Sequence, residues 1–204
     1  MEARAIADLV SKLIAKGDLR GAERALLEAR TQAETEKDTK ALEYVLSELI
    51  ELYGMFDPPL WAKAEELSEE RERLIPSAYS NLQTAMIFHH GVQDYRRAIP
   101  KLEEAIKQGK DQLDDKTVYT ALSLLGEAHV KLGHTDKAAE VLNQLEEMVA
   151  SKKSFVAGDE TCFLEELRAQ RLLSDRVARL ASTLASVCRD PAFKDRLRAL
   201  ATEA

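Results

Sequence analysis

The stretch LSLLGEAHVKLGHTDKAAEVLNQL, residues 122–145, reads as a helix, a tight turn and a second helix. Apolar residues recur on one stripe of the first half, Gly133 marks the end of that half, and Ala138 and Leu142 lie on the facing stripe of the second half. Small residues at Gly126 and Ala138 let two helix backbones approach closely, which two large side chains would prevent. The stretch therefore predicts a closely packed pair of helices.

Copies of this unit occur elsewhere in the chain. Aligning Gly17 with Gly133 places Ala22 and Leu26 on the corresponding small and large apolar positions without a gap. A third copy follows Pro76, which is expected at the first position of a helix. Its second half carries an aromatic, a small, a large apolar and a second small residue: Tyr95, Ala98, Leu102 and Ala105.

A fourth and weaker copy lies between these, at residues 39–74. Its first half ends at Gly54, and its turn is enlarged by residues 55–59. Asp57 and Pro58 are expected to cap and start the second helix of this copy. The pattern thus predicts four helix pairs in succession.

The pattern resembles the tetratricopeptide repeat (TPR) family. The residues in matching places are Leu122, Leu125, Gly126, His129, Ala138 and Leu142, with histidine where the family has an aromatic residue. The resemblance implies an all-α fold, a right-handed α-solenoid of TPR-like helix-turn-helix repeats. The repeats are expected at about residues 3–37, 38–75, 76–111 and 115–150, so that residues 1–150 form the repeat region.

The end of the chain is expected to cap the array. Residues 150–158 lack helical periodicity and are predicted to form a loop. Helical periodicity returns from Asp159 to Cys188, as one helix or as two helices divided at Ser174-Asp175, and a short helix starts near Pro191. Because a repeat array exposes an apolar face at each end, residues 159–204 are predicted to be capping helices.

Composition and charge limit the classes of partner. With 45% apolar residues and 5% aromatic residues the chain can bury a helical core, and its net charge is −7. Residues 159–204 are neutral overall, so the negative charge lies in the repeats and argues against nucleic acid and anionic membrane. The start of the chain is amphipathic and resembles neither a secretory signal nor an anchor. A cytoplasmic protein with reduced Cys162 and Cys188 is expected.

In the family, the first helix of each repeat lines a groove in which a partner peptide lies. Carried over by position, the expected partner-binding residues are Tyr44, Glu48, Glu51, Gln83, His90, Ser123 and Glu127. The cationic and amide residues with which some members grip a C-terminal carboxylate are mostly absent here. The acidic residues would suit a basic or amphipathic protein segment instead. The plainer interpretation is that each is an ordinary solvated side chain.

Catalytic and metal motifs are not found. The sequence holds no GxSxG and no GxxxxGK motif, so no enzyme activity, cofactor or metal is predicted. His89 and His129 occupy equivalent repeat positions and are expected in the core; a metal site or an enzyme using them with His90 is the weaker alternative. The predicted function is a non-enzymatic scaffold or adaptor. The main alternative is a structural homo-oligomer whose C-terminal helices fill the groove or mediate self-association.

Overall fold

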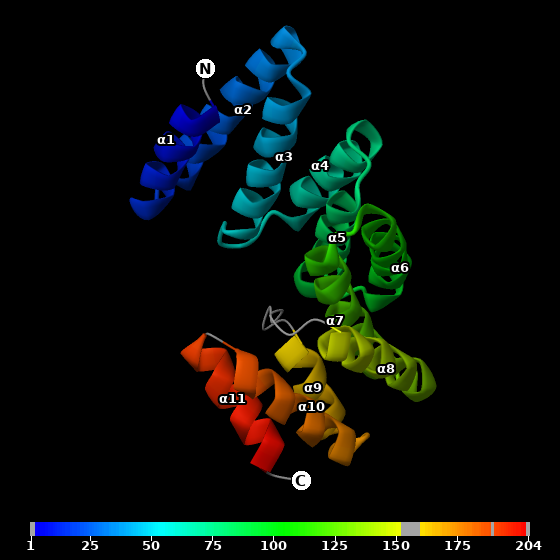
Figure 1. The fold of residues 1–204 in the computed structure, drawn as a ribbon. Coiled ribbons are helices and arrows are strands. Elements are labelled where there is room, and N and C mark those ends of the chain that lie inside the picture. Colours follow the sequence, from blue (N-terminus) through cyan, green and yellow to red (C-terminus); the bar gives the residue numbers. More distant parts are fainter. Residues whose placement is uncertain (1–2, 152–159, 189, 203–204) are drawn as a thin grey trace. The chain divides into compact units, whose positions relative to one another are not determined.

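The computed structural model describes residues 3–151, 160–188 and 190–202 (Figure 1). These residues form eleven α-helices and one short π-helix, with no strand among them. The predicted all-α class is therefore confirmed. By their contacts the residues divide into two compact units. Unit 1 comprises residues 1–76 and 90–92, and unit 2 comprises residues 77–89 and 93–204.

Unit 1 is built from four helices in which each packs against the next. They are α1 (Ala3–Ala15), α2 (Leu19–Glu36), α3 (Thr39–Gly54) and α4 (Trp61–Leu74). Leu26, Leu46 and Leu49 are completely buried between them. Arg71 of α4 is buried as well, and its guanidinium lies 3.1 Å from a carboxylate oxygen of Glu43 on α3. A buried charge must be paired in this way to offset its desolvation.

Unit 2 continues the helical pairs and ends in three further helices. The bounds are α5 (Ala78–Met86), α6 (Tyr95–Gln112), α7 (Asp115–Lys131), α8 (Thr135–Ser151), α9 (Glu160–Ala169), α10 (Ser174–Val187) and α11 (Pro191–Thr202). The π-helix η1 (Ile87–Gly91) directly follows α5. One apolar cluster runs from α5 to α11, and Leu102, Tyr119 and Phe163 are completely buried in it.

A left-handed residue stands at five of the turns. Gly17 and Gly133 have φ of 76° and 73°, which glycine adopts at little steric cost. Lys37, Gln93 and Leu113 take the same region, with φ between 53° and 56°. The left-handed residue reverses the chain at these five turns, whereas the enlarged turn between α3 and α4 contains none.

An aspartate follows the left-handed residue at four of these turns and caps the next helix. Asp18 and Asp94 each accept a hydrogen bond from the backbone amide three residues on, at 2.8 and 3.1 Å. Asp38 and Asp114 do the same for α3 and α7. At the fifth turn His134 stands in the place of the aspartate. Helix starts are thus fixed by local hydrogen bonds to otherwise unpaired amides.

Two predicted helix starts are wrong. Asp57 and Pro58 do not begin a helix; they are joined by a cis peptide bond, and α4 starts only at Trp61. The Leu60 amide donates to the Tyr53 carbonyl at 2.9 Å, so the intervening residues form a compact turn. Pro76 likewise precedes its helix, because Ser77 and Ser80 form a reciprocal capping box that starts α5 at Ala78.

The enlarged turn places Trp61 against two glycines of unit 1. A Cβ on Gly91 would lie 2.7 Å from the indole, and a Cβ on Gly54 would lie 3.1 Å from it. The ring therefore occupies space that only glycine leaves open. The five additional residues of the turn therefore have a structural role, which is to place Trp61 against these glycines.

The C-terminal region follows the two-helix alternative. α9 ends at Ala169 and α10 begins at Ser174, with left-handed Arg171 and Leu173 between them. Helix α8 also reaches Ser151, slightly beyond the expected start of the loop. The rest of that predicted loop, residues 152–158, lies outside the described residues.

Candidate functional site

Three of the residues predicted to bind a partner share one face of α3 in unit 1. Tyr44, Glu48 and Glu51 are spaced by four and three residues, which is one helical stripe. The Tyr44 hydroxyl neighbours the Glu48 carboxylate. Burial raises the pKa of Glu48, the charge of Glu51 adds to the rise, and the Tyr44 hydroxyl partly opposes it. We call these three residues the α3 face.

The α3 face carries two carboxylates, those of Glu48 and Glu51. Glu51 is exposed, and Tyr44 and Glu48 are half-buried. Burial, followed by the charges of Glu48 and Glu51, also raises the pKa of Tyr44. The arrangement suits a cation, because a positive charge would relieve the repulsion between the two carboxylates.

The remaining predicted residues are differently placed. Gln83 on α5 is buried, and His90 in η1 is exposed. Ser123 on α7 is only 1% exposed, and its hydroxyl donates to the Tyr119 carbonyl at 3.1 Å. Glu127, one turn further along α7, is half-buried. Ser123 and Glu127 thus share a helix, but the hydroxyl of Ser123 is already used within it.

Glu127 lies between a buried histidine and the acidic side of α9. Its carboxylate is 3.7 Å from His89 Nε2, and the Tyr95 ring meets His89 edge-on at 5.0 Å between ring centroids. Burial raises the pKa of Glu127, and the charges of Glu166 and Glu165 on α9 raise it further, against the opposing charge of Lys131. His89 is 2% exposed, so the expectation of a core histidine is confirmed.

Helix α9 covers part of the α7 surface that carries Glu127. A Cβ on Gly126 would lie 2.5 Å from the Phe163 ring, so the glycine admits that ring against the α7 backbone. Lys131 of α7 pairs with Glu166 of α9, and Gln170 Nε2 donates to the Val130 carbonyl at 3.5 Å. Gly126, the small residue of this repeat, thus receives an aromatic side chain from the C-terminal helices.

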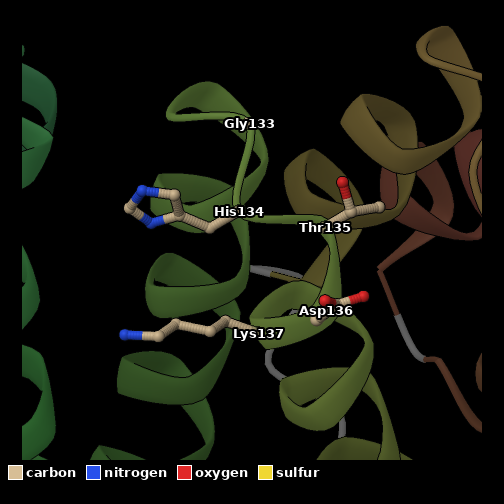
Figure 2. Close-up of a pocket in the computed structure, with 5 residues that line it drawn as sticks. All are labelled: Gly133, His134, Thr135, Asp136 and Lys137. Atoms are coloured by element: carbon tan, nitrogen blue, oxygen red, sulfur yellow. The ribbon is translucent and has the colours of Figure 1, made fainter.

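A second feature lies at the turn between α7 and α8. A hollow of about 330 Å³ is lined there by Gly133, His134, Thr135, Asp136 and Lys137, which are drawn in Figure 2. The side chains of His134 and Lys137 extend to one side of the turn, and those of Thr135 and Asp136 extend to the other (Figure 2).

His134 meets the second core histidine there. His129 Nδ1 lies 3.3 Å from His134 Nδ1, so one ring donates and the other accepts. Burial lowers the pKa of His129 to about 4, and the positive charges of Lys137 and His134 contribute. His129 is therefore neutral at physiological pH. Within the described residues no group of three or more His, Cys, Asp or Glu side chains could hold a metal ion.

Two further hollows along α6 and α8 were not predicted from the sequence. One, of about 370 Å³, is lined by Glu103, Ile106, Leu125, His129, Lys137, Glu140, Val141 and Gln144. The other, of about 380 Å³, is lined by Lys110, Asp115, Val118, Leu122, Gln144, Glu147, Met148 and Ser151. α6 and α8 are the second helices of two successive pairs. The family resemblance instead implies that the first helix of each pair binds the partner.

Comparison with known proteins bears on the fold and the family. A crystal structure described as nearly identical TPR-like repeats of a kinesin light chain from Podosopora anserina superposes with a TM-score of 0.61 at 18% identity, covering 97% of this chain and 93% of that one. At this identity the likeness shows the TPR-like fold alone. No curated protein matches the chain. In the described parts of the chain, no helix is long and apolar enough to cross a membrane.

The family model of anaphase-promoting complex subunit 5 matches residues 6–56 and 65–131. The two stretches cover α1 to α3 and then most of α4 together with α5, α6 and α7, so both contain the helix pairs described above. TPR-like repeat families are generally non-catalytic and mediate protein interactions. Because the match covers more than half of its residues, the chain belongs to the anaphase-promoting complex subunit 5 family of TPR-like helical repeats.

Proposed function

We propose that the chain is a non-enzymatic scaffold that binds a basic or amphipathic segment of a protein partner on the α3 face. The observation that carries the proposal is the environment of Glu48. This carboxylate is half-buried, and the neighbouring Glu51 raises its pKa further. A lysine or arginine of a partner would offset both effects, and such complementarity governs specificity and association rate.

The proposal also states the class of partner and the cellular location of the protein. The negative charge of the repeats disfavours nucleic acid and anionic membrane as partners. Cys162 and Cys188 are free thiols, which fits the reducing cytoplasm expected from the sequence. His90, Gln83, Ser123 and Glu127 stay part of the wider predicted surface, but the α3 face is where we place the first contact.

The test is affinity capture from cell extract, read by mass spectrometry, with two charge-matched variants. Glu48→Lys with Glu51→Lys reverses the α3 face, and Glu28→Lys with Glu66→Lys makes the same net change at exposed positions on α2 and α4. We expect the first variant to lose partners that the native chain and the second variant retain. If both variants capture the same proteins as the native chain, the α3 face is not the binding site.

A second candidate function is supported by the packing of α9 on α7. Phe163 and Glu166 occupy the surface beside Glu127 that a partner would otherwise approach. This favours the part of the alternative in which the C-terminal helices fill the binding surface; whether the chain is also a homo-oligomer is tested separately. Light-scattering mass over a concentration series tests the oligomer, since a constant monomer mass would rule it out.

A further inference from the structure

Three carboxylates gather where α9 packs on α7 in unit 2. Burial raises the pKa of Glu127 on α7, and the nearby charges of Glu166 and Glu165 on α9 raise it further, despite the opposing charge of Lys131. We call Glu127, Glu165 and Glu166 the carboxylate cluster. Like charges in partly buried positions weaken a contact between helices unless positive charges balance them.

Two of the three carboxylates have a permanent cation of their own. Arg196 of α11 binds both oxygens of Glu165, with Nε 2.9 Å from Oε1 and Nη2 2.6 Å from Oε2. Lys131 of α7 pairs with Glu166, and the hydrogen bond between them raises the pKa of the lysine, which is therefore charged at neutral pH. Among the described residues, the carboxylate without such a cation is Glu127.

The partner of Glu127 is a buried histidine. His89 Nε2 lies 3.7 Å from the Glu127 carboxylate, and the two side chains are 1% and 13% exposed. The histidine comes from the π-helix η1, and short π-helical turns are frequent at functional sites. Tyr95 at the start of α6 packs edge-on against the His89 ring. The pair is thus largely enclosed, where charges interact more strongly than they do in water.

A single proton completes the charge balance of the cluster. On His89, the proton converts the 3.7 Å contact with Glu127 into an ion pair. On Glu127, it removes the negative charge that has no permanent cation. Two groups this close take up the proton as a pair, so its effect on the contact has the same sign whichever group holds it.

We propose that the contact between α7 and α9 is a pH-sensitive switch, which strengthens when the pair of His89 and Glu127 binds one proton. The pair binds the proton more readily when α9 is docked, because docking brings the acidic side chains of α9 close to Glu127. The contact therefore gains stability as the pH falls and loses it as the pH rises and Glu127 becomes fully charged. The charged and titratable groups around the pair are Glu165 and Glu166 of α9, Lys131 of α7 and Tyr95 of α6.

The switch controls access to one surface of unit 2. Helix α9 covers part of the α7 surface that carries Glu127, so a weaker contact exposes that surface more often. The α3 face belongs to unit 1, and the switch does not depend on binding there. His129 on α7 responds to acid in the opposite direction, because burial lowers its pKa to about 4. A measurement confined to α9 is therefore needed.

Hydrogen exchange read by mass spectrometry reports the opening of α9 separately from that of other helices. After correction for the intrinsic effect of pH on exchange, we expect α9 of the native chain to be several-fold better protected at pH 5 than at pH 7. One linked proton limits the change to about tenfold per pH unit. In Glu127→Gln the excess charge is absent at both pH values, so α9 should already be well protected at pH 7 and should respond much less to pH.

A matched control separates the switch from the general effect of net charge. Glu140→Gln removes one carboxylate from an exposed position on α8, outside the cluster, and its α9 should respond to pH as in the native chain. Circular dichroism checks that both variants fold. The proposal is overturned if Glu127→Gln keeps the native response, if Glu140→Gln loses it too, or if α9 of the native chain is no better protected at pH 5 than at pH 7.

Discussion

At the scale of single residues, the left-handed turns differ in their steric cost. Leu113 adopts φ 56° although its side chain is 85% exposed and gains little from burial. Leu113→Gly removes a left-handed penalty of about 1–2 kcal/mol and adds an entropy cost of about 0.5–1 kcal/mol. We therefore expect a net rise of up to about 1.5 kcal/mol in the free energy of unfolding, measured as a higher urea midpoint.

Gly133 supplies the opposite change for comparison. Its φ is 73°, and a Cβ there would meet no atom within 4 Å. Gly133→Ala should therefore lower stability through backbone conformation alone, by about 1 kcal/mol. A lower midpoint for Leu113→Gly would show that the leucine contributes packing that outweighs its strained conformation.

The histidine pair predicts a pH dependence of stability. Burial lowers the pKa of His129 to about 4 in the folded state, below its ordinary value of 6.5. The unfolded chain thus binds the proton more readily, so this contribution to stability is complete above pH 6.5 and declines as the pH falls toward 4. The slope from this residue is at most about 1.4 kcal/mol per pH unit.

A variant isolates this contribution from the titration of carboxylates. His129→Phe restores the aromatic residue usual at this repeat position and removes the titrating group. Urea denaturation between pH 7 and pH 5 should show a smaller loss of stability for the variant than for the native chain. Parallel losses in the two proteins would mean that His129 titrates at nearly the same pH when folded and unfolded.

At the scale of helices, the contact of α9 with α7 depends on Gly126. A Cβ there would lie 2.5 Å from the Phe163 ring, which is completely buried. Gly126→Ala should therefore force the helices apart and destabilise unit 2 by about 1–3 kcal/mol, despite the better helix propensity of alanine. Adding Phe163→Leu should recover part of the loss, which thermal unfolding of both proteins would measure. If the stability losses of Gly126→Ala and Phe163→Leu simply add in the double variant, Gly126 and Phe163 are not in direct contact.

At the scale of the whole molecule, the two units predict localised responses to core damage. Leu46 is completely buried in unit 1 and Leu142 in unit 2. Replacing either with alanine should cost about 2–5 kcal/mol. Because repeats interact chiefly with their neighbours, hydrogen exchange should accelerate mainly in the unit that carries the substitution. Uniform acceleration along the chain for either variant would show that the molecule unfolds as a single cooperative body.

The sequence by itself determined the local structure. Apolar spacing predicted the helices, and glycines such as Gly17 and Gly133 marked turns, because these properties depend on residues within a few positions of each other. The same reasoning placed His89 and His129 in the core. It failed at Asp57 and Pro58, where a plausible cap lies in a compact turn that seats Trp61.

Only the tertiary structure decided which surfaces are covered. Glu127 and Glu166 are far apart in sequence, and their proximity follows from the packing of Phe163 on Gly126. The burial of Ser123 and the two hollows along α6 and α8 likewise depend on how neighbouring helices pack. Periodicity indicates which face of a helix is apolar, but not which neighbour covers it, because that choice depends on the combined packing of side chains from distant segments.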